Sequence, residues 1–155
     1  MDQKNIWLAA VLANGLLAGA SLDQSIEQLP ARHRIGARAY SAFSRASHRA
    51  NGRFWLVPLG IGGPLLTIGA AVTAARSKRG RASHLSGFAA ALAVAHMLST
   101  VKAASVNLTQ WRPGVDDAAL AGILQCFEKW QALRAGLQFL TFAVSAWAMA
   151  VESPT

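Results

Sequence analysis

The chain has 155 residues, enough for one domain, and 53% of them are hydrophobic while only 14% are charged. A soluble domain carries roughly 25% charged residues, and here the charges gather in two segments, 32–53 and 76–81. This pattern is typical of a membrane protein whose loops carry the charge. The formal net charge is +8, but the basic residues flank apolar runs, so attraction to anionic lipid explains them better than nucleic acid does. We therefore expect membrane lipid as a partner and no nucleic acid.

The first apolar run covers residues 6–22. Its segment Ala18-Gly19-Ala20 resembles a signal-peptidase site, so a secretory signal is one reading. Residues 1–5 carry one Lys and one Asp and are hardly basic, which favours a retained transmembrane helix. Gly15 and Gly19 form a GxxxG spacing, which would let a second helix approach closely.

Residues 23–30 are predicted to leave this helix, and residues 32–50 to form an amphipathic helix. Its basic face would lie among lipid headgroups or simply be solvated. Asn51-Gly52 predicts a turn that ends it. The basic face carries Arg34, Arg38, Arg45 and Arg49.

Residues 54–75 have no charge over 22 positions, enough to cross a hydrocarbon core of about 30 Å. Pro58 and Pro64 would bend this helix and open a cavity, or be packed against neighbouring helices. The next apolar run, 85–101, is rich in Ala and continues to Asn107. Residues 111–114 break it, and a last helix starts near Asp117, where a carboxylate suits the positive end of the helix dipole.

The predicted fold is all-α: an integral membrane four-helix up-down bundle with an amphipathic helix between helices 1 and 2. It is a single domain over residues 1–155, with spans at about 6–22, 54–75, 85–101 and 135–151. A raw count of Lys and Arg favours the long connections as the cytoplasmic side. The densest short loop, however, is 76–83, and several arginines of the other side could be structural. We expect loop 76–83 to be cytoplasmic, in a bacterial inner (plasma) membrane.

A polar seam is predicted on the last helix, since six side chains follow at spacings of 4, 4, 4, 3 and 4. Such a seam must face helices, a cavity or a substrate rather than lipid. Its arginine would snorkel to the interface, pair with Asp23 or Glu27, or bind an anionic group. The seam consists of Cys126, Trp130, Arg134, Gln138, Thr141 and Ser145.

His96 lies within the third apolar run. An imidazole inside an apolar bundle is expected to be neutral, and so to be a proton acceptor. A hydrogen bond to a neighbouring helix, or axial ligation of a haem together with a loop histidine, is the alternative. The sequence has no zinc, nucleotide-binding or hydrolase motif, so we expect no cofactor and no metal.

Several short pieces together resemble the anthrone-oxygenase-like family of small four-helix membrane proteins. These are Leu29-Pro30 in a polar loop, Asn107 after the third helix, and Trp130 with Arg134 at the start of the fourth span. The family's usual Pro-x-Asn stands here as Ser105-Val106-Asn107. The resemblance implies a cofactor-independent oxygenase acting on a hydrophobic phenolic or aromatic substrate.

In that reaction a base removes a proton from the substrate, and the resulting anion reduces O₂ directly. The protein would supply a base, a group that holds the anion, and a dry aromatic pocket. The expected catalytic residues are His96 as the base, with Arg134 and Asn107 holding the anion. The expected substrate-binding residues are Trp130, Tyr40 and Gln138.

The alternative is a non-enzymatic membrane subunit or scaffold that packs against a larger complex, binds lipid or forms a homo-oligomer. A soluble four-helix bundle is a third class, which residues 54–75 disfavour because they have no polar face. A pocket where Arg134, Asn107 and His96 converge would favour a ligand site. A filled bundle with Arg134 paired to Asp23 would favour a scaffold.

Overall fold

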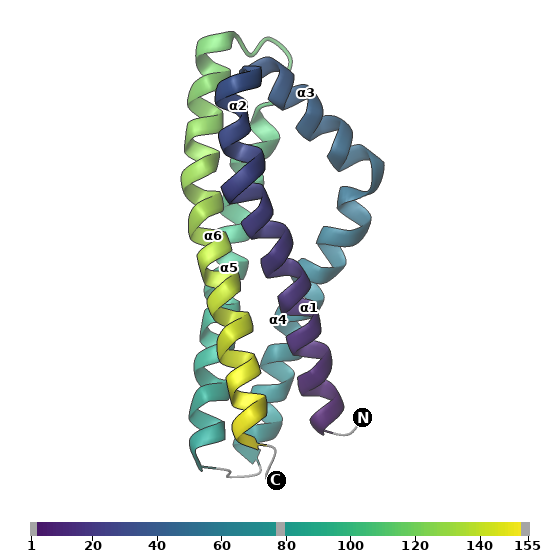
Figure 1. The fold of residues 1–155 in the computed structure, drawn as a ribbon, viewed down its shortest axis with the longest axis vertical. Coiled ribbons are helices and arrows are strands. Elements are labelled where there is room, and N and C mark those ends of the chain that lie inside the picture. The colour runs from purple at the N-terminus through teal and green to yellow at the C-terminus, as the bar shows by residue number, and fades with distance from the viewer. Residues whose placement is uncertain (1–2, 77–79, 153–155) are drawn as a thin grey trace.

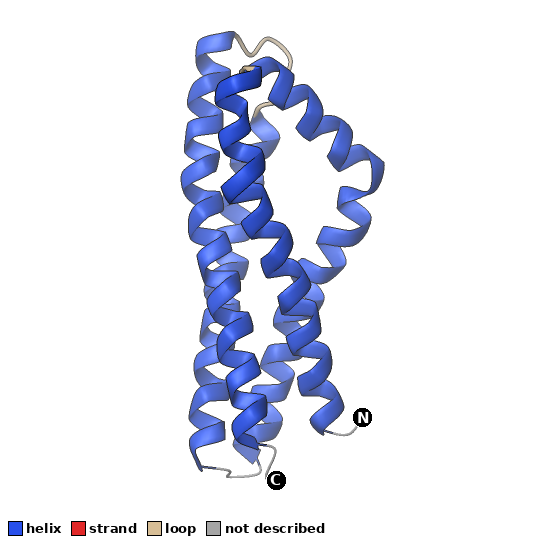
Figure 2. Ribbon diagram, viewed as in Figure 1, coloured by secondary structure: helices blue, strands red, loops and turns tan. Residues whose placement is uncertain are grey.

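The structure is a computed structural model of the chain and describes residues 3–76 and 80–152. These residues are almost entirely helical (Figure 2). Four long helices form the bundle, and two short helices, α2 and α3, lie between the first and second of them (Figure 1). The predicted all-α four-helix fold is confirmed. The long helices are α1 (Gln3–Asp23), α4 (Arg53–Arg76), α5 (Gly80–Thr109) and α6 (Asp117–Glu152), and the short ones are α2 (Leu29–Ile35) and α3 (Ala37–Ser47).

The long helices are arranged in a ring. Helices α1 and α5 each pack against both α4 and α6. The chain termini lie at one end of the bundle, and the α2–α3 junction and the α5–α6 connection lie at the other (Figure 1). This is the predicted up-down topology.

The prediction that residues 23–30 leave the first helix is wrong. A π-helical turn, Gln24–Gln28, carries the helix into α2 without a break. Pro30 lies in the first turn of α2, directly after the π-helical turn, and does not end the helix. The chain breaks instead at Gly36, whose φ of 88° and ψ of 154° only glycine adopts readily. The predicted helix over 32–50 is therefore split in two.

The predicted turn at Asn51-Gly52 is also wrong. These residues end a second π-helical turn, His48–Gly52, which joins α3 to α4. In Figure 1, α3 runs outward from the end of the bundle and the chain then bends back into α4. The amphipathic helix therefore forms one arm of an angle, and α4 forms the other.

Four helical stretches are long and apolar enough to cross a membrane: 3–35, 54–76, 82–109 and 117–151. They exceed the predicted spans because the helices continue into polar sequence. Large apolar side chains face outward along them, as a lipid environment requires; Leu16, Trp55 and Leu98 are each at least 65% exposed. The chain is a membrane protein.

The bundle interior has two apolar clusters separated by a polar middle. Leu29, Tyr40 and Phe127 belong to the cluster near α2 and α3, and Trp7 with Ala70 and Ala148 forms the cluster near the termini. Buried polar side chains lie between the clusters; Asn14 donates to Thr67 across helices, and Thr141 donates to the Leu137 carbonyl of its own helix. They include Asn14, Thr67, His96, Gln131, Gln138, Thr141 and Ser145.

Small residues allow close helix contacts at particular points. A Cβ at Gly15 would lie 3.0 Å from the Phe142 ring, whereas one at Gly19 would meet nothing within 4 Å. Only half of the GxxxG spacing is therefore used. Of the two prolines in α4, Pro64 is buried and Pro58 is exposed, so Pro64 is packed among neighbouring helices.

Candidate functional site

A cavity of about 330 Å³ lies between the turn after α1, helix α3, the first turns of α4 and the end of α5. Its α4 wall is apolar and consists of Leu56, Val57, Gly60 and Ile61, which lie on both sides of Pro58 in the sequence. The opposite wall is polar. The polar lining consists of Gln24, Gln28, Tyr40, Ser44, Ser47, His48, Thr100, Asn107 and Arg134.

Arg134 enters this cavity from α6. Its Nη2 donates to the side-chain oxygen of Gln24 at 3.2 Å, whereas its Nε is buried and has no partner. Gln24 also shares a side-chain hydrogen bond with Tyr40. Arg134 is thus held in place, and its Nε–H is among the donors that it can still offer a ligand.

Tyr40 is 1% exposed. Burial raises the pKa of its hydroxyl above the ordinary value, and the neighbouring Arg32 opposes part of the rise. Tyr40 therefore remains a neutral phenol at physiological pH. A neutral hydroxyl can donate a hydrogen bond to an anionic oxygen in the cavity.

Asn107 lies at the end of α5. Its side-chain oxygen accepts a hydrogen bond from Gln110 Nε2. This contact fixes the amide orientation, because the oxygen is the acceptor. The amide N–H₂ group of Asn107 then remains as a donor on the cavity wall.

His48 also lines the cavity, and the sequence reasoning missed it. Its ring centroid lies 5.3 Å from that of Trp111. Tyr40, Ser44 and His48 follow one another at intervals of four and lie on a different face from the arginines. This spacing of four residues was the sequence signal that could have identified His48.

Three of the six predicted site residues, Tyr40, Asn107 and Arg134, meet in this cavity, and the other three do not line it. His96 is completely buried and neither ring nitrogen has a partner, although Arg134 is near enough to interact with it electrostatically. Gln138 is buried with its side-chain oxygen unpartnered. Trp130 packs against the apolar cluster of Leu29 and Phe127.

The predicted polar seam is only partly correct. Gln138, Thr141 and Ser145 are buried, but Cys126 is exposed. A step of four residues overshoots a full helical turn by about 40°, so three such steps place Cys126 about 120° from Gln138. Gln131 takes the inward position and donates to the Ser21 carbonyl at 3.2 Å.

Of the alternatives for Arg134, pairing with Asp23 or Glu27 is not the one observed, since Arg134 donates to Gln24. Asp23 instead accepts a hydrogen bond from Gln28 at 2.5 Å. An ion pair that the sequence did not reveal joins Arg32 of α2 to Glu128 of α6, and the Arg32 side chain is only 9% exposed. This pair ties α2 to the bundle beside the cavity.

Among the residues that the structure describes, no three His, Cys, Asp or Glu side chains gather closely enough to hold a metal ion. No family model, curated protein or solved structure matches this chain. The interpretation of the cavity therefore depends on its own geometry.

Proposed function

We propose that this membrane protein binds a flat apolar molecule carrying a phenolic or enolic oxygen in the cavity between α3 and α4. The unpartnered, buried Nε of Arg134 carries the proposal. A guanidinium group with a free N–H in a partly apolar cavity favours an anionic oxygen. Tyr40 and Asn107 supply further donors from the same wall.

The apolar part of the lining suits the body of such a molecule. Leu56, Val57 and Ile61 of α4 and Phe43 of α3 line the cavity. An aromatic body placed against them leaves water, while its oxygen stays beside the polar groups. A volume of about 330 Å³ is at the lower end of the usual range for small-molecule sites.

The reaction that we propose is cofactor-independent oxygenation, as the resemblance to the anthrone-oxygenase-like family implies. A base takes a proton from a methylene carbon that is conjugated with the phenol. The carbanion passes electrons to O₂; one oxygen atom becomes the new carbonyl and the other leaves as water. In outline, R₂CH₂ + O₂ gives R₂C=O + H₂O.

His48 is the base that we propose in place of His96, because His48 lines the cavity and His96 does not. Arg134 would hold the phenolate oxygen as negative charge develops on it. A base positioned in this way contributes about 10² to 10⁴ in rate.

The test is ligand binding and oxygen uptake by purified protein with a hydroxyanthrone. Arg134→Gln should weaken binding by roughly 10- to 100-fold, the range for a lost hydrogen bond to a charged group. Lys129→Gln, an exposed position on the same helix, is the control. His48→Gln should slow uptake of isotopically labelled O₂ into the product much more than it weakens binding.

The outcomes separate the candidate functions. Binding without oxygen uptake would support a ligand-binding protein and contradict the oxygenase reaction. Absence of both would favour the non-enzymatic subunit or scaffold, with a homo-oligomer or another membrane protein as its partner. Loss of binding in Lys129→Gln equal to that in Arg134→Gln would contradict the assigned site.

We also propose a bacterial inner membrane as the location, with loop 76–83 in the cytoplasm. Support comes from the short loop itself, which carries Arg76, Lys78, Arg79 and Arg81 within six residues. Cys126 is exposed near the opposite end and is the only cysteine. A membrane-impermeant maleimide should label it in intact spheroplasts; labelling only after permeabilisation would reverse the orientation.

A further inference from the structure

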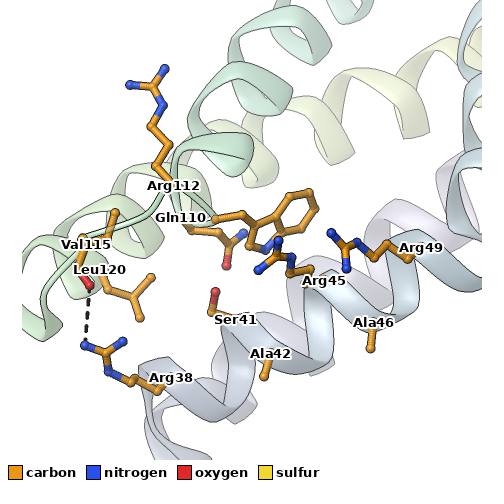
Figure 3. Close-up of a pocket in the computed structure, with 12 residues that line it drawn as sticks. Arg38, Ser41, Ala42, Arg45, Ala46, Arg49, Gln110, Arg112, Val115 and Leu120 are labelled. Carbon is orange, nitrogen blue, oxygen red and sulfur yellow. Dashed lines mark hydrogen bonds between the residues drawn. The ribbon is translucent and has the colours of Figure 1, made fainter.

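A second cavity lies on the other face of α3. It has a volume of about 470 Å³ and separates α3 from the α5–α6 connection (Figure 3). We call it the arginine groove. Its lining includes four arginines and no carboxylate. The arginines are Arg38, Arg45, Arg49 and Arg112.

Two of these arginines are free to bind an anion. Arg45 of α3 and Arg49 of the π-helical turn after it lie one turn apart and extend toward the connection (Figure 3). In the described part of the chain neither has an ion pair or hydrogen bond. Arg38 is already occupied, because it pairs with Asp117 and donates to the Val115 carbonyl. Arg112 points away from the groove (Figure 3).

The connection contributes two buried polar atoms without partners. Gln110 is 5% exposed, and its side-chain oxygen, which lies on the groove side in Figure 3, accepts no hydrogen bond. The indole N–H of Trp111 is buried and donates to no acceptor. Buried polar atoms are almost always hydrogen-bonded, so an occupant of the groove should offer both an acceptor and a donor.

The surroundings favour a lipid as that occupant. Below α3, helix α4 starts with Phe54 and Trp55, which are 63% and 68% exposed. Exposed aromatic side chains at the start of a spanning helix mark the level of the headgroups. An acyl chain could then descend along the outward-facing apolar surface of α4.

We propose that the arginine groove binds the headgroup of an anionic glycerophospholipid with a free hydroxyl, of the phosphatidylglycerol type. The phosphate lies between Arg45 and Arg49 and accepts from the Trp111 N–H. The headgroup hydroxyl donates to the Gln110 oxygen. This proposal does not depend on the ligand proposed for the other cavity.

The test uses the full chain purified in a neutral detergent with added phosphatidylglycerol, and native mass spectrometry measures the retained lipid. Arg45→Gln with Arg49→Gln should weaken retention by about 25-fold, since each basic group near an anionic surface contributes roughly fivefold. The control, Arg34→Gln with Lys129→Gln, removes the same charge at exposed positions outside the groove. It should leave retention within about twofold.

A milder variant, Trp111→Phe, keeps the aromatic body and removes only the N–H donor. It should weaken lipid retention about threefold to tenfold, as the loss of one hydrogen bond does. This variant tests the site even if the double arginine variant fails to fold. Equal losses in the two double variants would show general charge attraction and overturn the site. Displacement of the lipid by glycerol 3-phosphate at equal concentration would show a site for soluble phosphate and would also overturn the proposal.

Discussion

Gly63 on α4 provides the sharpest test of the packing. A Cβ at Gly63 would lie 3.0 Å from the side-chain oxygen of Asn14 on α1. The Asn14 amide cannot easily retreat, because its Nδ2 donates to the Ala10 carbonyl at 2.8 Å and to Thr67 Oγ1 at 2.7 Å. Gly63→Ala must therefore strain the helix contact or break a buried hydrogen bond.

The magnitude follows from those two terms. Overpacking costs about 1–3 kcal/mol, and an interhelical hydrogen bond in a membrane is worth on average about 0.6 kcal/mol. We expect Gly63→Ala to lower the free energy of unfolding by about 1–3 kcal/mol from overpacking alone, and by up to about 3.5 kcal/mol if the hydrogen bond is lost as well. Gly62→Ala is the matched control, since a Cβ there meets nothing within 4 Å. It should be neutral or stabilise by up to about 1 kcal/mol.

The assay is reversible unfolding in mixed micelles of rising dodecyl sulfate content, followed by circular dichroism. In an Asn14→Ala background the clashing oxygen is gone, and the nearest remaining atom is Ala13 Cβ at 3.7 Å. Gly63→Ala should then cost no more than Gly62→Ala. If the two alanine variants are equally destabilising in the native background, or if Asn14→Ala brings no relief, the reasoning is refuted.

Three further predictions concern the end of the bundle near α3. Glu128→Gln leaves the largely buried Arg32 without its carboxylate and should cost about 1–3 kcal/mol in the same unfolding assay, less than a fully buried pair because Glu128 is partly exposed; an unchanged midpoint would contradict this. Tyr40 is the only tyrosine, so phenolate absorbance reports its titration alone, and the midpoint of the Tyr40 pKa titration should lie above 10.0. The free energy of unfolding should fall as the pH rises above 10.0, because the phenol ionises first in the unfolded chain. Gly36→Ala should cost about 1–3 kcal/mol because of its φ and ψ, while Gly19→Ala, with open space around its Cβ, should not.

The fold could be predicted because the membrane imposes a simple rule. A run of 22 residues without charge, at 54–75, leaves few choices, and the breaker residues at 111–114 give the last connection. The path between α1 and α4 could not be predicted in this way. Pro30 and Asn51-Gly52 are strong local signals for a helix break, but both lie in helical turns here. The helix breaks at Gly36 instead.

The site was partly predictable for a related reason. Arg134 and Asn107 stood out because polar side chains at the ends of apolar runs need partners, and Tyr40 was a polar candidate on the amphipathic helix at the same end. Trp130 did not fit, because a spacing of four drifts around the helix and Gln131 faces inward in its place. His48 was missed although Tyr40, Ser44 and His48 follow at intervals of four, because that spacing does not show the angle between α3 and α4 that forms the cavity.

The helix lengths have a consequence for how a ligand arrives. Helix α6 has 36 residues and is about 54 Å long, whereas the hydrocarbon core is about 30 Å thick. Because α4 starts only at Arg53, the part of α6 that exceeds the hydrocarbon thickness lies at the end of the bundle that carries α2 and α3. The cavity beside the first turns of α4 then lies near the edge of one leaflet, and Leu56, Val57 and Ile61 of its lining are 43–51% exposed. A hydrophobic ligand would enter from the lipid without crossing water, so its half-saturating concentration should follow the ligand-to-lipid ratio rather than the total aqueous concentration.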